Sequence, residues 1–225
     1  MPTGVIELII LAGIAIFLLF RLRGVLGTKT GLEEQQASRA MRPEPARPVR
    51  RQGAAPVEDE GGIDPDSATV AEGDDRVGEA LAAMRRAEPQ FLASEFMVGA
   101  RQAFEMILMA YEHGDLDTLR RFLAPDVYSG FAQAIEQRKA DGLTVEAKFV
   151  GVRDARVVDA RYNPSTREAE IAIRFTAELI SVVRDAANTV VEGDPNEVRR
   201  ETDVWTFGRR MGVNDPNWTL VATGE

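Results

Sequence analysis

The sequence contains no cysteine and only one histidine, His113. The absence of cysteine excludes disulfides, thiolate metal sites and cysteine nucleophiles. A single histidine excludes zinc sites that need two histidine ligands, including the helical H-E-x-x-H arrangement. The chain also has no glycine-rich phosphate-binding loop. We therefore predict no catalytic residue, no cofactor-binding residue and no metal ligand.

Positive charge is scarce in the C-terminal part of the chain. The net charge is −9, and acidic residues outnumber basic ones from residue 58 onward. Nucleic-acid-binding proteins need a basic surface that neutralises phosphates. We therefore expect no nucleic acid among the partners.

The N-terminus contains a long apolar run with one charged residue, Glu7. Residues 4–20 reach the lower limit for a helix that crosses about 30 Å of hydrocarbon. No basic residue precedes the run and no small-x-small site follows it, so an anchor is favoured over a cleaved signal peptide. We expect a single transmembrane helix within residues 1–31, with the apolar side chains Val5, Ile6, Leu8, Ile9, Ile10, Leu11, Ile14, Ile16, Phe17, Leu18, Leu19 and Phe20 in the bilayer.

The basic residues of this region follow the apolar run. Arg21, Arg23 and Lys29 come directly after it. Because basic flanks stay on the cytoplasmic side, we expect a single-pass protein of a bacterial inner membrane with its C-terminal domain in the cytoplasm.

Residues 32–76 are rich in proline, alanine and charge and have no apolar periodicity. Such a segment cannot bury enough apolar surface to offset its chain entropy, so we predict a disordered linker. Its arginines are close to the anchor in sequence, where anionic lipid attracts basic side chains. A purely solvated tether is the alternative interpretation.

The remaining part, residues 77–225, changes from a helical period to a strand period. Apolar spacing predicts a helix over residues 91–113 that ends at Gly114, a short helix capped by Asp115, and a helix from Pro125 to Gly142. Alternation then predicts strands over residues 145–149 and 170–179, separated from later strands by turns. Helices followed by a meander of strands indicate an α+β fold with a curved antiparallel sheet.

Several separated motifs in this part resemble the Tim44-like family. They are the stretches that begin at Phe96, Gly114, Leu123, Thr202 and Asp215, and they occur in the same order. The N-terminal stretch 21–31 is similar to that of alphaproteobacterial members. The resemblance implies a cone-shaped fold related to nuclear transport factor two, with an apolar pocket and no enzymatic activity. In mitochondria the family member tethers a chaperone to the presequence translocase at cardiolipin membranes, so we expect membrane lipids and partner proteins as partners.

Two sets of side chains are candidates for contact with these partners. By comparison with the mitochondrial relatives, the first helices of the domain supply a lipid or partner face, with core packing as the alternative; it comprises Leu81, Met84, Arg85, Arg86, Phe91, Leu92 and Phe96. The second set is expected to line the pocket: Phe104, Tyr128, Phe175, Asp203, Trp205 and Phe207. We interpret His113 as a cation at a helix C-terminus and not as a catalytic base.

These observations favour a non-enzymatic, membrane-tethered module that docks a protein involved in translocation, chaperone action or membrane-protein assembly. The alternative is a pocket that binds a lipid or another small ligand, or a pocket enzyme of the same fold.

The anchor assignment predicts how the protein behaves on membrane extraction. Because residues 4–20 are expected to cross the bilayer, the full chain should stay with the membrane pellet after treatment with alkaline carbonate. Release into the supernatant, or a mature chain that begins after Gly31, would contradict the assignment.

Overall fold

The computed structural model describes residues 62–213 and 215–224, which belong to one compact unit, Asp59–Glu225. The helices come first: α2 (Pro65–Ala71), α3 (Asp75–Ala87), α4 (Ala93–His113), α5 (Leu116–Phe122) and α6 (Pro125–Ala140). The strands follow: β1 (Thr144–Asn163), β2 (Glu168–Arg184), β3 (Val190–Gly193), β4 (Arg199–Arg210) and β5 (Thr219–Gly224). The predicted α+β order is confirmed.

The predicted anchor and most of the predicted linker, residues 1–61, lie outside the described residues. Within the described residues, no helix has the length and apolar character that a membrane crossing requires.

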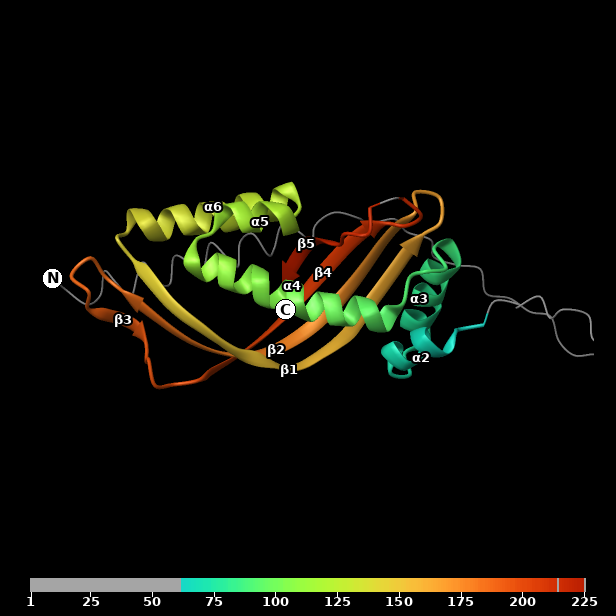
Figure 1. Ribbon diagram of the computed structural model, residues 1–225, viewed down its shortest axis with the longest axis horizontal. Coiled ribbons are helices and arrows are strands. Elements are labelled where there is room, and N and C mark those ends of the chain that lie inside the picture. The colour runs from blue at the N-terminus through green and yellow to red at the C-terminus, as the bar shows by residue number, and fades with distance from the viewer. Residues whose placement is uncertain (1–61, 214, 225) are drawn as a thin grey trace, which may run out of the picture. The chain divides into compact units, whose positions relative to one another are not determined.

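The strands form one antiparallel sheet in the order β1-β2-β4-β5, and β3 pairs with the end of β2. Register shifts interrupt the β1–β2 pairing at three places along β1. Bulges of this kind bend a strand and increase its twist. The sheet is strongly curved, and α4, α5 and α6 lie on its concave side, with α4 running across it (Figure 1).

The predicted helix ends agree with the structure. Gly114 adopts the left-handed conformation at the end of α4, with φ of 70°. The carboxylate of Asp115 accepts the backbone N–H of Thr118 at 3.0 Å and so caps α5. Pro125 is the first residue of α6.

The inner face of β2 is the face that alternation predicted. Ile171, Ile173, Phe175, Ala177 and Leu179 are all at most 1% exposed. The strand itself is longer than predicted at both ends, because its extensions pair with β1 and β3 and need no apolar pattern of their own.

The predicted linker extended too far toward the C-terminus. Helix α2 lies within residues 32–76, and α3 begins at Asp75. The carboxylate of Asp66 on α2 accepts the backbone N–H of Ala93 at 2.6 Å, at the start of α4. Helix α4 has no cap from its own preceding residue, Leu92. A contact with a distant helix therefore stabilises a segment that composition alone assigned to the disordered linker.

A second contact fixes the corner between α3 and α4. Glu88 forms an ion pair with Arg209 of β4 and accepts the backbone N–H of Gly212 at 2.8 Å. Burial raises the pKa of Glu88, but the hydrogen bonds from Arg209 and Gly212 outweigh burial and lower the pKa overall. Trp218 lies under the Arg209 guanidinium and against the ring of Phe96, whose centroid is 4.6 Å away.

We predict that Asp66→Ala lowers the free energy of unfolding by about 1 kcal/mol, because it leaves the first N–H groups of α4 without their acceptor. Urea unfolding of residues 59–225 measures the change. Asp126→Ala is the matched control, since Asp126 lies in the first turn of α6 but is exposed there. Equal losses in the two variants would show that Asp66 does not cap α4.

Candidate functional site

Four of the side chains predicted to line a pocket meet beneath α4. Phe104 stacks on Phe175 with ring centroids 4.4 Å apart and touches Trp205 at 4.5 Å. Phe207 contacts Trp205 at 6.4 Å. All four rings are at most 4% exposed. At this point the concave face is filled by the protein's own aromatic side chains.

The polar side chains predicted to line the pocket, Asp203 and Tyr128, form hydrogen bonds in different parts of the fold. Asp203 accepts the indole N–H of Trp205 at 2.9 Å and the backbone N–H of Val204 at 2.8 Å. Tyr128 lies on α6, where its hydroxyl accepts a hydrogen bond from Arg120 at 2.9 Å. His113 is exposed at the end of α4. The structure thus places Asp203 beside the rings, whereas Tyr128 packs between helices.

The predicted lipid or partner face is mostly interior. Leu81 and Met84 are fully buried, and Phe91 and Phe96 are at most 7% exposed. Core packing, the alternative interpretation, accounts for these four side chains, because the face of α3 that carries Leu81 and Met84 packs inward.

The other members of that face are polar or only half-buried. Arg85 forms an ion pair with Asp64 at 3.1 Å, so it belongs to the contact between α2 and α3. Arg86 is exposed and Leu92 is half-buried.

Glu112 occupies an unusual position near the end of α4. Its carboxylate accepts a long hydrogen bond, 3.4 Å, from the hydroxyl of Ser181 on β2. The nearby Arg138 donates instead to the backbone carbonyls of Tyr111 and Glu112, at 2.9 Å and 2.8 Å. Burial is the main cause that raises the pKa of Glu112, and the negative charge of Glu201 adds to the increase; the positive charge of Arg138 opposes the increase without cancelling it. This carboxylate is partly desolvated without a cation that hydrogen-bonds to it.

Sequence reasoning did not select Glu112 or Glu201 as functional candidates. One signal was available for Glu112: a carboxylate in the last turn of a helix faces the negative end of the helix dipole, where an acid is unfavourable. Glu201 gave no such signal, because its proximity to Glu112 depends on how β4 crosses beneath α4.

Glu178 shows the opposite arrangement on the convex face of the sheet. Its oxygens accept hydrogen bonds from Arg153 at 2.6 Å and from Arg200 at 3.0 Å. The hydrogen bonds from Arg153 and Arg200 lower the pKa of Glu178. This carboxylate has its cations within the fold and links β1, β2 and β4.

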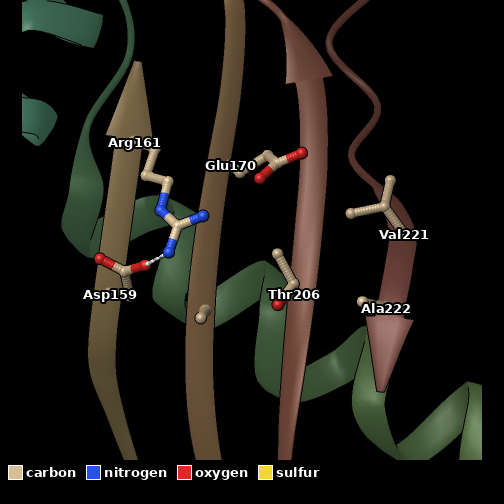
Figure 2. A pocket seen from close by; sticks show the side chains of 7 residues that line it. Asp159, Arg161, Glu170, Thr206, Val221 and Ala222 are labelled. Atoms are coloured by element: carbon tan, nitrogen blue, oxygen red, sulfur yellow. Dashed lines mark ion pairs between the residues drawn. The ribbon is translucent and has the colours of Figure 1, made fainter. Parts of the chain in front are cut away.

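The convex face also contains a hollow of about 280 Å³ (Figure 2). Asp159 and Arg161 form an ion pair across 2.8 Å at its border. The small side chains Ala172 and Ala222 line the hollow together with charged side chains of both signs. Its lining comprises Asp159, Arg161, Glu170, Ala172, Thr206, Val221 and Ala222.

A second hollow, of about 580 Å³, is lined by residues from the start of β1, the end of β2 and the end of α4. His113, at the end of α4, lines this hollow opposite residues from β1 and β2. Its lining is mainly apolar and comprises His113, Val145, Glu146, Ala147, Lys148, Ile180, Val182 and Pro195.

We predict that Glu112→Gln stabilises the protein at neutral pH. A raised pKa means that the folded state holds the proton more tightly than the unfolded state, so stability falls as pH rises through the ordinary glutamate range. The gain should appear at pH 7 in urea unfolding of residues 59–225 and vanish at about pH 4, where the carboxyl is largely protonated. Glu105→Gln, at an exposed position of the same helix, is the control and should leave the free energy of unfolding unchanged at both pH values. A gain of equal size at both pH values would exclude the charge as its cause.

Comparison with known proteins agrees with the resemblance found in the sequence. Residues 77–225 match the Tim44-like domain family. The human mitochondrial import inner membrane translocase subunit TIM44 is 30% identical over 149 residues, which cover 64% of this chain and 32% of the human protein. The rat subunit of the same name is 27% identical over the same shares of the two chains.

This chain therefore spans about a third of the length of those relatives. Among solved structures, the intermembrane space region of the chloroplast protein ARC6 is similar with a TM-score of 0.37 and 14% identity, over 58% of this chain and 92% of that one. The family match covers more than half of the chain, and the chain belongs to the Tim44-like domain family.

Proposed function

We propose that this protein is a non-enzymatic binding protein anchored in a bacterial inner membrane, whose Tim44-like domain docks a partner protein on the cytoplasmic side. The partner acts in protein translocation, chaperone recruitment or membrane-protein assembly. The observation that carries the proposal is the family match over residues 77–225. The relatives that share the domain are named as subunits of a protein import translocase.

The interior of the domain supports a docking role over a pocket role. A ligand site or an active site requires an open cavity into which a few polar groups converge. Here Phe104, Phe175 and Trp205 occupy the concave face in mutual contact. Asp203 binds the indole of Trp205 and so supports the packing of the rings. The cone-shaped pocket expected from the resemblance is, on this proposal, a filled core that keeps the outer surfaces rigid.

The sequence before the domain supports placement at a membrane. An apolar run followed by Arg21 and Arg23 is typical of an anchor with a cytoplasmic C-terminal side. The proline-rich residues between the anchor and α2 would give the domain reach around its anchoring point. On this proposal the membrane lipids contact the anchor and its basic flank, and the folded domain meets the partner protein.

Site-specific photocrosslinking of the full chain in its native membrane tests the docking role. A photoreactive residue at the exposed positions Val98 on α4 and Val191 on β3 should yield at least one discrete protein adduct, identifiable by mass spectrometry. The same residue at the buried Ile173 should give only products within the chain. Lipid adducts alone at the exposed positions would favour the lipid-binding alternative, and the absence of any adduct would contradict docking.

A further inference from the structure

Strand β4 is longer than the strand that covers its outer side. On one side it pairs with β2 along its whole length, from Arg199 to Arg210. On the other side β5 pairs with it only from Val204 to Gly208. Within the described part of the chain, no strand covers the outer side of residues 199–202. We call these four residues the open β4 edge.

Backbone groups along this edge are available to a further strand. In an antiparallel sheet, alternate residues direct their N–H and C=O groups to one neighbour and the residues between them to the other. All four residues of the open β4 edge are exposed. Their register with β2 runs without a bulge from Arg199, opposite Leu179, to Thr202, opposite Thr176. A regular, exposed edge of this kind is a template for strand addition.

The other long edge of the sheet is protected. Strand β1 carries three register irregularities, and Arg101 of α4 donates a hydrogen bond to the carbonyl of Ala155 at 3.3 Å. Bulges, covering elements and charged side chains are the usual means by which proteins prevent pairing at an edge. In the described structure the open β4 edge has no bulge and no covering strand, and its two arginines are held in ion pairs with Glu192 and Glu178.

Most side chains of the open β4 edge already have partners within the fold. Arg199 pairs with Glu192 at 3.3 Å, and Arg200 with Glu178 at 3.0 Å. The hydroxyl of Thr202 lies 3.1 Å from that of Thr176. Glu201 differs, because the described structure gives its carboxylate no ion pair or hydrogen bond.

Glu201 faces the concave side of the sheet. Side chains alternate along a strand, so Glu201 shares its face with the buried Trp205. Glu112 reaches the same side from α4, through its contact with Ser181 of β2. Glu201 therefore lies without a hydrogen-bonding cation at an edge that can accept another strand, and the negative charge of Glu112 is near enough to interact with it.

We propose that the open β4 edge binds an extended segment of the partner protein as an additional β-strand, and that a lysine or arginine of this segment lies against Glu201 and Glu112. The proposal rests on the docking function above and specifies the chemistry of the partner. Main-chain hydrogen bonds would supply affinity and the basic side chain would supply selectivity, as in other cases of strand addition.

The same features disfavour other occupants. An anionic lipid surface would be repelled by the two carboxylates. A helical partner satisfies its own N–H and C=O groups and has none to offer a strand edge. An acidic peptide could pair with the edge but would bring like charges together.

Synthetic peptides test the proposal directly on the full chain in detergent micelles. The probe is a short peptide of alternating valine and threonine with one central lysine, and its binding is followed by fluorescence anisotropy. We expect it to bind about tenfold more tightly than the same peptide with a central glutamate. A version that is N-methylated at alternate residues cannot form the ladder and should lose binding. Hydrogen exchange should slow at residues 199–202 when the lysine peptide is present.

Two charge-reversal variants of the protein complete the test. Glu201→Lys should reverse the preference, so that the glutamate peptide binds more tightly. Glu105→Lys is the matched control, because Glu105 is exposed on the opposite side of α4 from the buried Phe104 and Ile107, and it should leave the preference unchanged. Circular dichroism of both variants shows whether the fold is retained.

Several results would overturn the proposal. These are equal binding of the lysine and glutamate peptides, binding that survives N-methylation, no binding of any peptide, and an unchanged preference in Glu201→Lys. Binding that appears only after deletion of residues 39–51 would assign the edge to the chain's own arginine-rich segment. In each case a protein adduct at Val98 or Val191 in the photocrosslinking experiment would still support docking, so the two proposals fail separately.

Discussion

Packing of α4 against the inner face of a bent antiparallel sheet is the interaction on which the rest of the structure depends. Phe96 and Phe104 from the helix meet Phe175, Trp205 and Phe207 from β2 and β4. Burial of a large apolar side chain contributes about 1.5–3 kcal/mol, so these five rings form a major part of the core. Because the rings fill the concave side, the surfaces left for binding are the convex face, the sheet edges and the end of the sheet that extends past β4 and β5.

Polar contacts near the C-terminal end of α3 fix how the helices enter this core. Asp64 binds Arg85 in the last turn of α3, and Asp66 caps α4. Glu88, the C-cap of α3, pairs with Arg209. These contacts join segments that are distant in sequence, and each carboxylate has a donor within the fold. They explain why the folded unit begins before the residues that match the family.

Glu178 of β2 and Glu112 of α4 have pKa values shifted in opposite directions by their surroundings. Glu178 is held between two arginines, which stabilise its charged form. Glu112 is partly buried and has only a long hydrogen bond from a hydroxyl, so burial disfavours its charged form. The first therefore strengthens the sheet, whereas the second lies at the end of α4, where burial disfavours its charge.

The sequence alone determined the local structure of this protein. The existence of α4, its end at Gly114, the cap at Asp115, the start of α6 at Pro125 and the buried face of β2 all follow from side-chain period and capping, which act between near neighbours in the chain. The start of α4 does not, because the helix begins at Ala93, two residues later than predicted. The family could also be recognised from motifs in their order. Tertiary structure decided what depends on distant contacts: α2 is ordered because Asp66 meets α4, and Phe91 and Phe96 are core because Trp218 covers them. The electrostatic interaction of Glu112 with Glu201 and the uncovered edge of β4 also depend on how the sheet bends and where β5 ends, and no local sequence pattern predicts either.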